Sequence, residues 1–299
     1  MENRFNQGIN KIENRYLMNR LEQDNQFIKN MIEAGKPFFI GRIAGIELKI
    51  AYSIRHRRPI DMIHEIEELD NNAGIHITNF ESLYEYADQL VSSYDHCTAI
   101  AEWETTGKVF AITGDGQQLI TERTPQIPKI MAQSLEPYYV KDSWMSALRG
   151  KRILIIHPFV KTIEKQLPHL SSIFPNREWF PECTIKCLAP PLTLAQNHKN
   201  KAWNVHLDEF LVTLSKEKEV DVALVAAGGY GMLISDYLYT KMNISVLYIG
   251  GALQLFFGII GKRWFTNKDI LTLMNDEWVR PDLTDKPDNF IKVEKGCYW

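Results

Sequence analysis

The sequence predicts an α/β protein with a Rossmann-like, mostly parallel sheet flanked by helices. Short apolar runs in the second half of the chain are each followed by a helical pattern, and LVAAGGYGMLI (224–234) places a glycine-rich turn after one such run. Strands that alternate with helices are joined by crossovers, so neighbouring strands are parallel. We therefore expect a single α/β domain over residues 1–299, with two lobes (1–142 and 143–299) around a cleft.

The first half is predicted to open with a long polar helix from about Lys11 to Ala34, ended by Gly35 and Pro37. The next segment, PFFIGRIAGIELKIAYSI (37–54), has an apolar run that suits a buried strand, then a glycine-bounded turn and a helical pattern. A strand-turn-helix unit is therefore expected there.

Another helix is expected after Thr78, because Thr78 and Glu81 form a capping-box pattern and the apolar positions that follow share one face. The segments CTAIAEW (97–103) and KVFAIT (108–113) are predicted strands. Asp115 stands between two glycines, which is typical of a turn residue.

The second half repeats one theme three times. The predicted strands are KRILIIHPF (151–159), DVALVAAGGYG (221–231) and ISVLYIGG (244–251). The predicted helices that follow them are KTIEKQLPHLSSIF (161–174), MLISDYLYTKM (232–242) and ALQLFFGII (252–260).

Composition argues against several classes of function. The chain of 299 residues has a formal charge of −3, which gives no sign of the basic surface that duplex nucleic acid requires. The N-terminus lacks the apolar core of a secretory signal, and the longest nearly uncharged stretch, 244–261, falls short of the roughly 20 apolar residues of a spanning helix. We expect no nucleic-acid partner, no transmembrane segment and a cytoplasmic location, either free or peripheral at the membrane face; formation of a homo-oligomer stays open.

The four cysteines are too few for a disulfide scaffold, so free thiols are expected. Cys183 and Cys187 form a lone C-x3-C, and His198 and His206 lie too far along the chain to complete a recognisable zinc set with them.

The turn AAGGYGML (226–233) follows a strand, where parallel sheets bind ligands through backbone N–H groups. It fails as a dinucleotide fingerprint, because Ile234 stands where a third small residue belongs and the next strand ends without an acidic residue. A P-loop is not found either, since GIIGKRW has the wrong spacing. A tight turn without a ligand is the alternative interpretation.

Three successive strands end in HPF, AAGGYG and IGGALQ, and Lys262, Arg263 and Trp264 follow the last of them. Backbone donors, cations and an aromatic ring could meet there at one rim, which would suit a diphosphate. Lys262 and Arg263 could instead only complement the dipole of a helix.

Four segments resemble a family of capsule, O-antigen and surface-glycan glycosyltransferases of the GT-D type. They are LEPYYVKDSWMSALRGKRILIIHPF (135–159), DVALVAAGGYGMLISDYL (221–238), LYIGGALQLFFGIIGKRW (247–264) and EWVRPDLTDKPDNFIKVEKGCYW (277–299). The resemblance covers most of the chain and is strongest after residue 134. It implies a Rossmann-like fold that transfers a sugar from a UDP-, GDP- or dTDP-linked donor to a glycan or glycoconjugate acceptor.

Enzymes of this type carry an R-x-G-D-G-E stretch after the first strand, where two carboxylates hold a divalent metal against the donor diphosphate. The corresponding stretch here is RIAGIE (42–47), with Gly45 where the aspartate belongs. The resemblance implies Mn²⁺ or Mg²⁺ at Glu47, although a lone carboxylate is a poor site for these ions. Glu47 could instead act as a base, hold a sugar hydroxyl or pair with Arg42.

Glycosyl transfer needs a stabiliser for the departing diphosphate and, if it inverts, a base for the acceptor hydroxyl. The candidate catalytic residues are Glu47, Arg42, Glu102 and Asp115, with Glu104 as a further base candidate. Arg263 is the first choice for the diphosphate, because a planar fork matches phosphate oxygens.

The candidate donor-binding residues are strand-end glycines and nearby polar or charged side chains: Gly41, His157, Gly228, Gly229, Tyr230, Gly231, Gly250, Gly251, Gln254, Lys262 and Arg263. His157 could equally be a buried, hydrogen-bonded structural histidine. Trp103 and Trp264 are the candidates for contact with a sugar face.

The sequence thus predicts a glycosyltransferase that uses a nucleotide-activated sugar. A non-catalytic nucleotide-sugar or glycan-binding protein with a degenerate metal motif is the alternative. A methyltransferase that uses S-adenosylmethionine is a weaker third hypothesis, since the strand after the glycine turn ends without an acidic residue.

Overall fold

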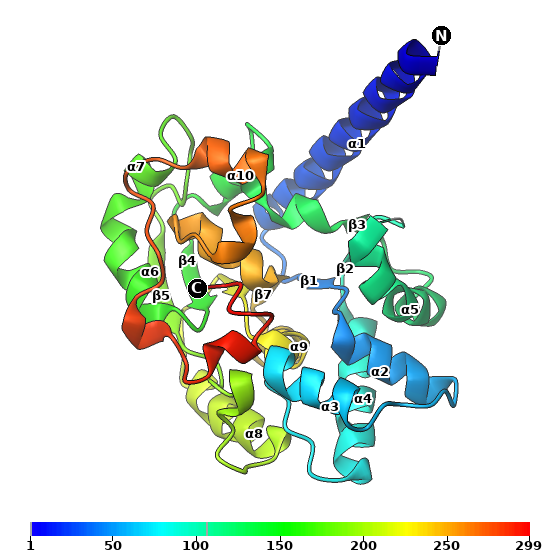
Figure 1. Ribbon diagram of the computed structural model, residues 1–299. Coiled ribbons are helices and arrows are strands. Elements are labelled where there is room, and N and C mark those ends of the chain that lie inside the picture. The colour runs from blue at the N-terminus through cyan, green and yellow to red at the C-terminus, as the bar shows by residue number, and fades with distance from the viewer. Residues whose placement is uncertain (1, 106) are drawn as a thin grey trace.

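A computed structural model describes residues 2–105 and 107–299, with side chains over 15–105 and 109–299. Seven strands form one parallel sheet in the order β3-β2-β1-β7-β6-β4-β5, and helices flank it (Figure 1). The strands are β1 (Phe39–Arg42), β2 (Ala99–Glu102), β3 (Lys129–Met131), β4 (Arg152–Ile156), β5 (Thr184–Leu188), β6 (Val222–Val225) and β7 (Ser245–Tyr248). The predicted Rossmann-like α/β fold is confirmed.

The α-helices follow the predicted pattern in most places. They are α1 (Glu2–Glu33), α2 (Ile46–Arg55), α3 (His64–Glu68), α4 (Phe80–Ser93), α5 (Gly107–Arg123), α6 (Val160–Gln166), α7 (Leu170–Ile173), α8 (Trp203–Leu214), α9 (Gly231–Met242) and α10 (Lys268–Leu273). The helix expected over 161–174 is split by a 3₁₀ turn that contains Pro168. The helix expected after β7 is the 3₁₀ helix Gly250–Phe257.

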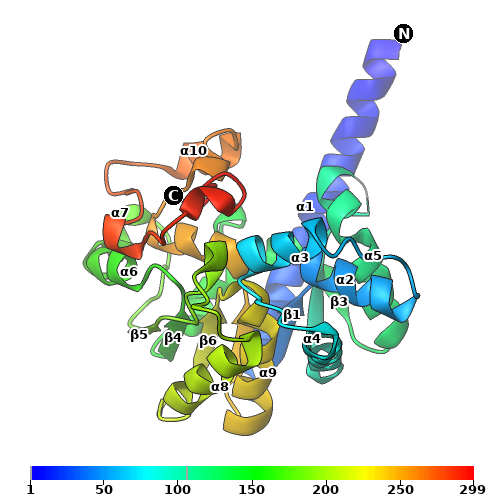
Figure 2. The same ribbon diagram turned by 60° about the horizontal axis from the view of Figure 1, so that its bottom comes forward.

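Two apolar cores lie on opposite faces of the sheet. Side chains of α2, α4, α8 and α9 fill one core, and side chains of α1, α6 and the 3₁₀ helix Gly250–Phe257 fill the other. The central strands β6 and β7 are buried over their whole length, as parallel strands covered on both faces should be. The C-terminal residues pass over the carboxyl ends of the strands and lie beside the end of α3 (Figures 1 and 2).

The two halves of the chain share this sheet. β1 to β3 come from residues before 142, and β4 to β7 come from residues after it. β1 pairs with β7 through Phe39 opposite Val246 and Ile40 opposite Leu247, so hydrogen bonds continue across the junction.

The predicted strand KVFAIT (108–113) is wrong, because these residues lie in α5. Asp115 is therefore a helical residue and not a turn residue. Gly116 explains the unusual helix sequence, since a Cβ there would come within 2.4 Å of the Leu48 Cβ. The glycine lets α5 approach α2 closely, so its place in the sequence reflects helix packing and not a turn.

The predicted capping residue of α4 is also wrong by one position. Asn79 caps the helix, because its side chain accepts a hydrogen bond from the Ser82 backbone at 2.8 Å. The apolar face of α4 is buried as predicted, with Leu83, Tyr86 and Leu90 each 1% exposed.

Two edge strands, β3 and β5, have no counterpart among the predicted elements. Each carries a lysine, and the side chains of β5 alternate between exposed and partly buried positions. Such strands lack the continuous apolar run that marks the central ones. All four cysteines are free thiols, as expected. Within the described part of the chain, no helix is both long and apolar enough to cross a membrane.

Candidate functional site

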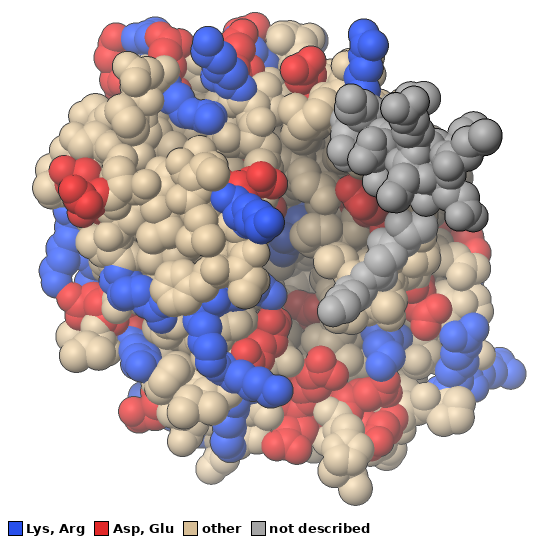
Figure 3. All heavy atoms as spheres, turned by 45° about the horizontal axis from the view of Figure 1, so that its top comes forward, with Lys and Arg blue, Asp and Glu red and all other residues tan. Residues whose placement is uncertain are grey.

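The candidate site lies where β1 and β7 end side by side. The chain after β1 places Ile43 and Ile46 in the core on one face of the sheet, whereas the chain after β7 places Leu253 and Phe256 in the core on the other face. Open parallel sheets bind ligands in the crevice that such a divergence creates. Figure 3 shows a hollow between the two halves of the molecule, with charged atoms of both signs at it.

We call this place the β1–β7 crevice and define it by Arg42, Glu47, Trp103, Tyr248 and Gly250. Arg42 is the last residue of β1, and its guanidinium carbon lies 5.3 Å from the Trp103 ring centroid and 5.5 Å from that of Tyr248. The Arg42 Nε is buried and has no hydrogen-bond partner. Because an unsatisfied buried N–H is costly, this group favours a bound acceptor.

Gly250 sets how closely the loop after β7 approaches Arg42. Its φ of +71° is in the left-handed region, and a Cβ there would lie 2.0 Å from the Arg42 Nη2. Any larger residue would have to move the guanidinium. Gly250 thus packs against Arg42, and its predicted contact with a donor stays a prediction.

Glu47 lies in the first turn of α2 and is only 9% exposed. Burial raises the pKa of its carboxyl group, and the backbone N–H groups at Glu47 and Gly45 and the charge of Arg42 oppose that rise. A carboxylate with a raised pKa is closer to the value that suits a general base near neutral pH.

Arg263 has both arms of its guanidinium engaged. Its Nη1 donates to the Tyr298 hydroxyl at 2.8 Å and its Nη2 donates to the Glu294 carboxylate at 2.9 Å. Both contacts would have to give way before Arg263 could bind a phosphate through these two nitrogens, so its role as a phosphate ligand stays a prediction. Arg42, with its unpartnered Nε, is the better-placed cation.

Glu136, Glu294 and Tyr298 are site residues that the sequence did not single out. Glu136 accepts a hydrogen bond from the Tyr138 hydroxyl, and burial raises its pKa against the attraction of Arg42 and Arg263. All three lie in irregular segments or short 3₁₀ turns. No local pattern marks them, because only the tertiary fold brings them to Arg42 and Arg263.

The glycine turn after β6 packs against protein atoms. A Cβ on Gly228 would lie 2.8 Å from the Ala73 carbonyl oxygen, and a Cβ on Gly229 would lie 2.4 Å from Ile75. The Tyr86 hydroxyl donates to the Gly229 carbonyl at 2.9 Å. The turn therefore fits the alternative interpretation, a tight corner that shapes the wall of the site.

Two more predicted donor-binding glycines are also packed against side chains. A Cβ on Gly231 would lie 2.2 Å from the Tyr248 ring, and a Cβ on Gly41 would lie 2.6 Å from the Cys97 Sγ. The Tyr230 side chain is 1% exposed, and its hydroxyl has no hydrogen-bond partner.

His157 and Gln254 are buried and serve the fold. The His157 Nδ1 accepts a hydrogen bond from the Phe159 backbone at 2.9 Å, and burial lowers the pKa of the ring to about 3, so it is neutral. The Gln254 Nε2 donates to the carbonyl oxygens of Ile259 and Tyr298. The structural alternative for His157 fits these contacts.

The remaining predicted residues of the last segment flank Tyr298. Gly251 packs against the Tyr298 ring, since a Cβ there would approach it to 2.4 Å. Trp264 is 8% exposed and meets the same ring edge-on, whereas Lys262 is exposed. Of these residues, only Lys262 has a side chain that is open to solvent.

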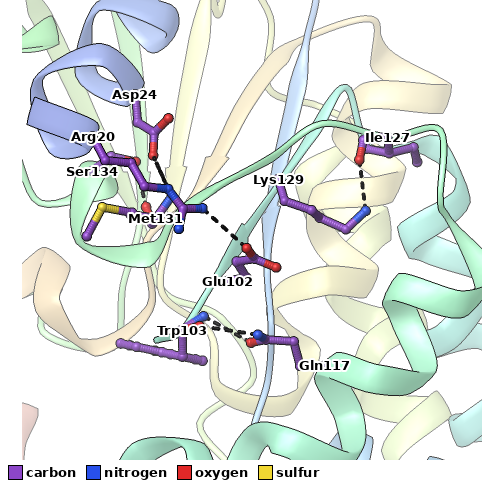
Figure 4. A network of polar contacts seen from close by, with 9 residues as sticks. All are labelled: Arg20, Asp24, Glu102, Trp103, Gln117, Ile127, Lys129, Met131 and Ser134. Atoms are coloured by element: carbon purple, nitrogen blue, oxygen red, sulfur yellow. Dashed lines mark hydrogen bonds and ion pairs between the residues drawn. The ribbon is translucent and has the colours of Figure 1, made fainter. Parts of the chain in front are cut away.

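Glu102 and Trp103 point in different directions at the end of β2 (Figure 4). The Glu102 carboxylate accepts a hydrogen bond from Arg20 of α1 at 3.3 Å, so it anchors that helix. The Trp103 backbone exchanges hydrogen bonds with the Gln117 side chain at 3.0 and 3.2 Å, and its indole N–H donates to the Ile43 carbonyl at 3.1 Å. The indole is therefore fixed as a wall of the β1–β7 crevice.

Asp115 lies outside the crevice. It is on α5, where it forms an ion pair with Arg58 at 3.5 Å and lines a surface groove of about 590 Å³ between α2 and α5. The structure thus does not bring Asp115 to the other predicted catalytic residues.

The surroundings of Glu47 do not fit the metal site of the resembled enzymes. Gly45 supplies no carboxylate, and the positive charge of Arg42 beside Glu47 would repel a second cation. A different group, Asp70, His76 and His198, brings one ligand atom from each residue within 4.8 Å of the others. Sequence spacing did not reveal it, because His198 is 122 positions after His76.

Comparisons of the chain with protein-family models, with curated proteins and with solved structures give no match. The functional assignment therefore depends on the β1–β7 crevice.

Proposed function

We propose that the chain is a glycosyltransferase that moves a sugar from a nucleoside-diphosphate donor to a glycan or glycoconjugate acceptor. The observation that supports this most directly is Arg42, a cation at the divergence of two strands with an unpartnered buried Nε. Diphosphate is the part of such a donor that a guanidinium binds best. We also propose a cytoplasmic location, free or at the membrane face.

In the proposed reaction, Arg42 binds the diphosphate and the Trp103 indole packs against the sugar. Glu47 takes the proton of the acceptor hydroxyl, whose oxygen bonds to the anomeric carbon as the bond from that carbon to the diphosphate breaks. The departing diphosphate carries the negative charge to Arg42. This charge is stabilised without solvent reorganisation if the guanidinium is already in place.

The metal does not enter the proposed steps. Mn²⁺ or Mg²⁺ belongs to the resembled enzymes, where two carboxylates hold it. This chain has only one of these carboxylates, so metal dependence is measured directly. Activity with and without a chelator should be the same if Arg42 alone supports the diphosphate.

A binding test addresses the donor. UDP, GDP, dTDP and their sugars are titrated into the full chain and followed by calorimetry, with Arg42→Ala compared against Arg149→Ala, an exposed arginine on the surface. We expect one nucleotide to bind and Arg42→Ala to weaken it at least about 10-fold, which corresponds to about 1.4 kcal/mol. If no member of the panel binds at millimolar concentration, the proposal is wrong.

Turnover separates the enzyme from the non-catalytic alternative. Slow hydrolysis or transfer of the bound donor should be lost in Glu47→Gln while donor binding persists, with a fall of about 100-fold or more. A wild-type chain that binds the donor but neither hydrolyses nor transfers it, with any acceptor, would favour a nucleotide-sugar-binding protein.

A further inference from the structure

A second cluster of polar side chains contains none of the residues that define the β1–β7 crevice. Asp70 belongs to the π-helical turn Leu69–Ala73 after α3, His76 follows that turn, and His198 follows β5. The neighbouring Asn72 accepts a hydrogen bond from the Glu294 backbone at 3.1 Å. The cluster is therefore at the rim where α3 meets the C-terminal segment (Figure 2).

Two distances within the cluster have the size of metal-ligand separations, and the one to His76 is also within hydrogen-bond range. The Asp70 Oδ2 lies 3.3 Å from the His76 Nδ1 and 3.4 Å from the His198 Nε2. A typical N–H···O hydrogen bond is shorter, at roughly 2.9–3.0 Å. Two ligands bound tetrahedrally to zinc at about 2.0–2.2 Å lie about 3.3–3.5 Å apart.

Buried atoms without partners provide an independent observation. The Asp70 Oδ1 has no hydrogen-bond partner, although Asp70 is only 9% exposed. Asn71 contributes another unpartnered buried oxygen, its Oδ1. An unsatisfied buried polar atom is costly, so the Asp70 Oδ1, which belongs to the cluster itself, favours a bound group that it can contact.

We infer that Asp70, His76 and His198 bind one transition-metal ion of the Zn²⁺ class, with at least one coordination position left for water. Two imidazoles and one carboxylate are donors that suit Zn²⁺, Co²⁺ or Ni²⁺, whereas Mg²⁺ and Ca²⁺ prefer oxygen ligands alone. The site is independent of the proposed glycosyl transfer, since none of its ligands belongs to the β1–β7 crevice.

Binding requires two local changes. The His76 and His198 rings are stacked 3.6 Å apart at 6°, so one ring has to turn before both nitrogens can face one ion. The Asn200 backbone N–H donates to the His198 Nδ1 at 3.0 Å, which leaves the proton of the neutral ring on Nε2. Binding at Nε2 moves this proton to Nδ1 and releases the Asn200 contact.

The segment around His198 is suited to such a change. Lys199 and Asn200 have φ values of 51° and 59°, in the left-handed region that non-glycine residues rarely adopt. Backbone strain of this kind is concentrated at ligand-binding and switch segments. Release of the Asn200 contact would let this backbone leave a strained conformation.

The test is a titration of the full chain, freed of metal by a chelator and then dialysed. We expect one Zn²⁺ per chain by calorimetry, and an absorption spectrum of tetrahedral or five-coordinate Co²⁺ when Co²⁺ replaces it. Asp70→Asn, His76→Gln and His198→Gln should each weaken Zn²⁺ binding by more than the roughly 10–100-fold that loss of an outer partner costs. His96→Gln, an exposed histidine paired with Asp236, is the matched control.

Thermal melts provide a second readout that does not depend on activity. Zn²⁺ should raise the melting temperature of the wild type and of His96→Gln in a concentration-dependent way, but not that of His76→Gln. Asp70→Asn keeps the size of the side chain, so it remains informative if a histidine variant does not fold. Stoichiometric binding that is unchanged in Asp70→Asn, or no binding by the wild type, would overturn the inference and leave a hydrated polar cluster.

Discussion

At the scale of single residues, the contact between Gly250 and Arg42 predicts the effect of a substitution at Gly250, and a second glycine with a similar φ serves as the control. Gly250→Ala should weaken nucleotide binding at least about 10-fold, because its Cβ would displace the guanidinium. Gly150→Ala is the control, since Gly150 has a similar φ of +70° and open space around it. Both variants carry a similar backbone strain of roughly 1–2 kcal/mol, so Gly150→Ala should lose stability but not nucleotide binding, whereas Gly250→Ala should lose both; urea melts and calorimetric titrations measure the two effects.

The carboxyl group of Glu47 makes a prediction about pH. Its pKa is raised in the folded protein by burial, so the folded state holds this proton more tightly than the unfolded state does. The free energy of unfolding of the wild type should therefore fall, relative to Glu47→Gln, as pH rises from the ordinary value of 4.5 through the raised pKa. Urea melts over a series of pH values measure this, with the exposed Glu122→Gln as the surface control. A constant difference between wild type and Glu47→Gln would contradict it.

The missing carboxylate at position 45 can be restored. A Cβ at Gly45 would lie 4.0 Å from the Glu47 Oε2, and Gly45 is the residue that precedes the first turn of α2. Gly45→Asp should therefore create a two-carboxylate site and bind Mn²⁺ more tightly than the wild type, while Gly45→Asn should not. Paramagnetic resonance of Mn²⁺ counts the bound ion. Equal Mn²⁺ binding by both variants would show that position 45 does not face the ion.

At the scale of elements, the N-terminus of α4 has two adjacent candidates for its capping residue, Thr78 and Asn79. Asn79→Ala should lower the free energy of unfolding by about 0.5–2 kcal/mol, because it removes the acceptor of the Ser82 N–H. Thr78→Ala should have little effect, since the Thr78 side chain does not cap the helix. Urea denaturation of the two variants measures the difference, and a larger loss in Thr78→Ala would reverse the assignment.

The elements show which signals the sequence carries. β6 and β7 were predictable because β6 is apolar throughout and β7 is apolar after Ser245, as is typical of strands covered on both faces. The edge strands β3 and β5 were not, because β3 has only three residues and begins with Lys129, and Lys186 interrupts the apolar pattern of β5. The start of α5 has the composition of a strand, and only packing against α2 shows why it is helical. In this segment, packing of α5 against α2 outweighs the β-strand propensity of its residues.

The residues of the candidate site also fall into a group that the sequence could indicate and a group that it could not. Arg42, Glu47 and Trp103 were predictable because each follows closely on a strand that the sequence revealed. Glu136, Glu294 and Tyr298 were not, because irregular segments distant in the sequence carry them to the crevice. The partners that occupy Arg263 come from the C-terminal residues 294 and 298, so its availability could be judged only from the fold.

At the scale of the whole molecule, α1 is fixed to the junction between the two halves. Asn25 is 3% exposed; its side chain donates to the Asp142 carbonyl at 3.0 Å and accepts from the Trp144 N–H at 2.9 Å. Asn25→Ala should lower the free energy of unfolding by about 1–3 kcal/mol, because it leaves buried backbone groups unpaired. Gln26→Ala, at an exposed position of the same helix, is the control. Denaturation should remain one transition in both variants if the shared sheet makes the halves cooperative.

The pairing of β1 with β7 also bears on how the chain is made. About 200 residues separate these neighbours, which at roughly 5–20 residues per second is about 10–40 s of synthesis. During that interval, the edge of β1 that later receives β7 has no partner from its own chain. Exposed strand edges recruit other chains, so the nascent protein should need chaperone cover until residue 248 has left the ribosome.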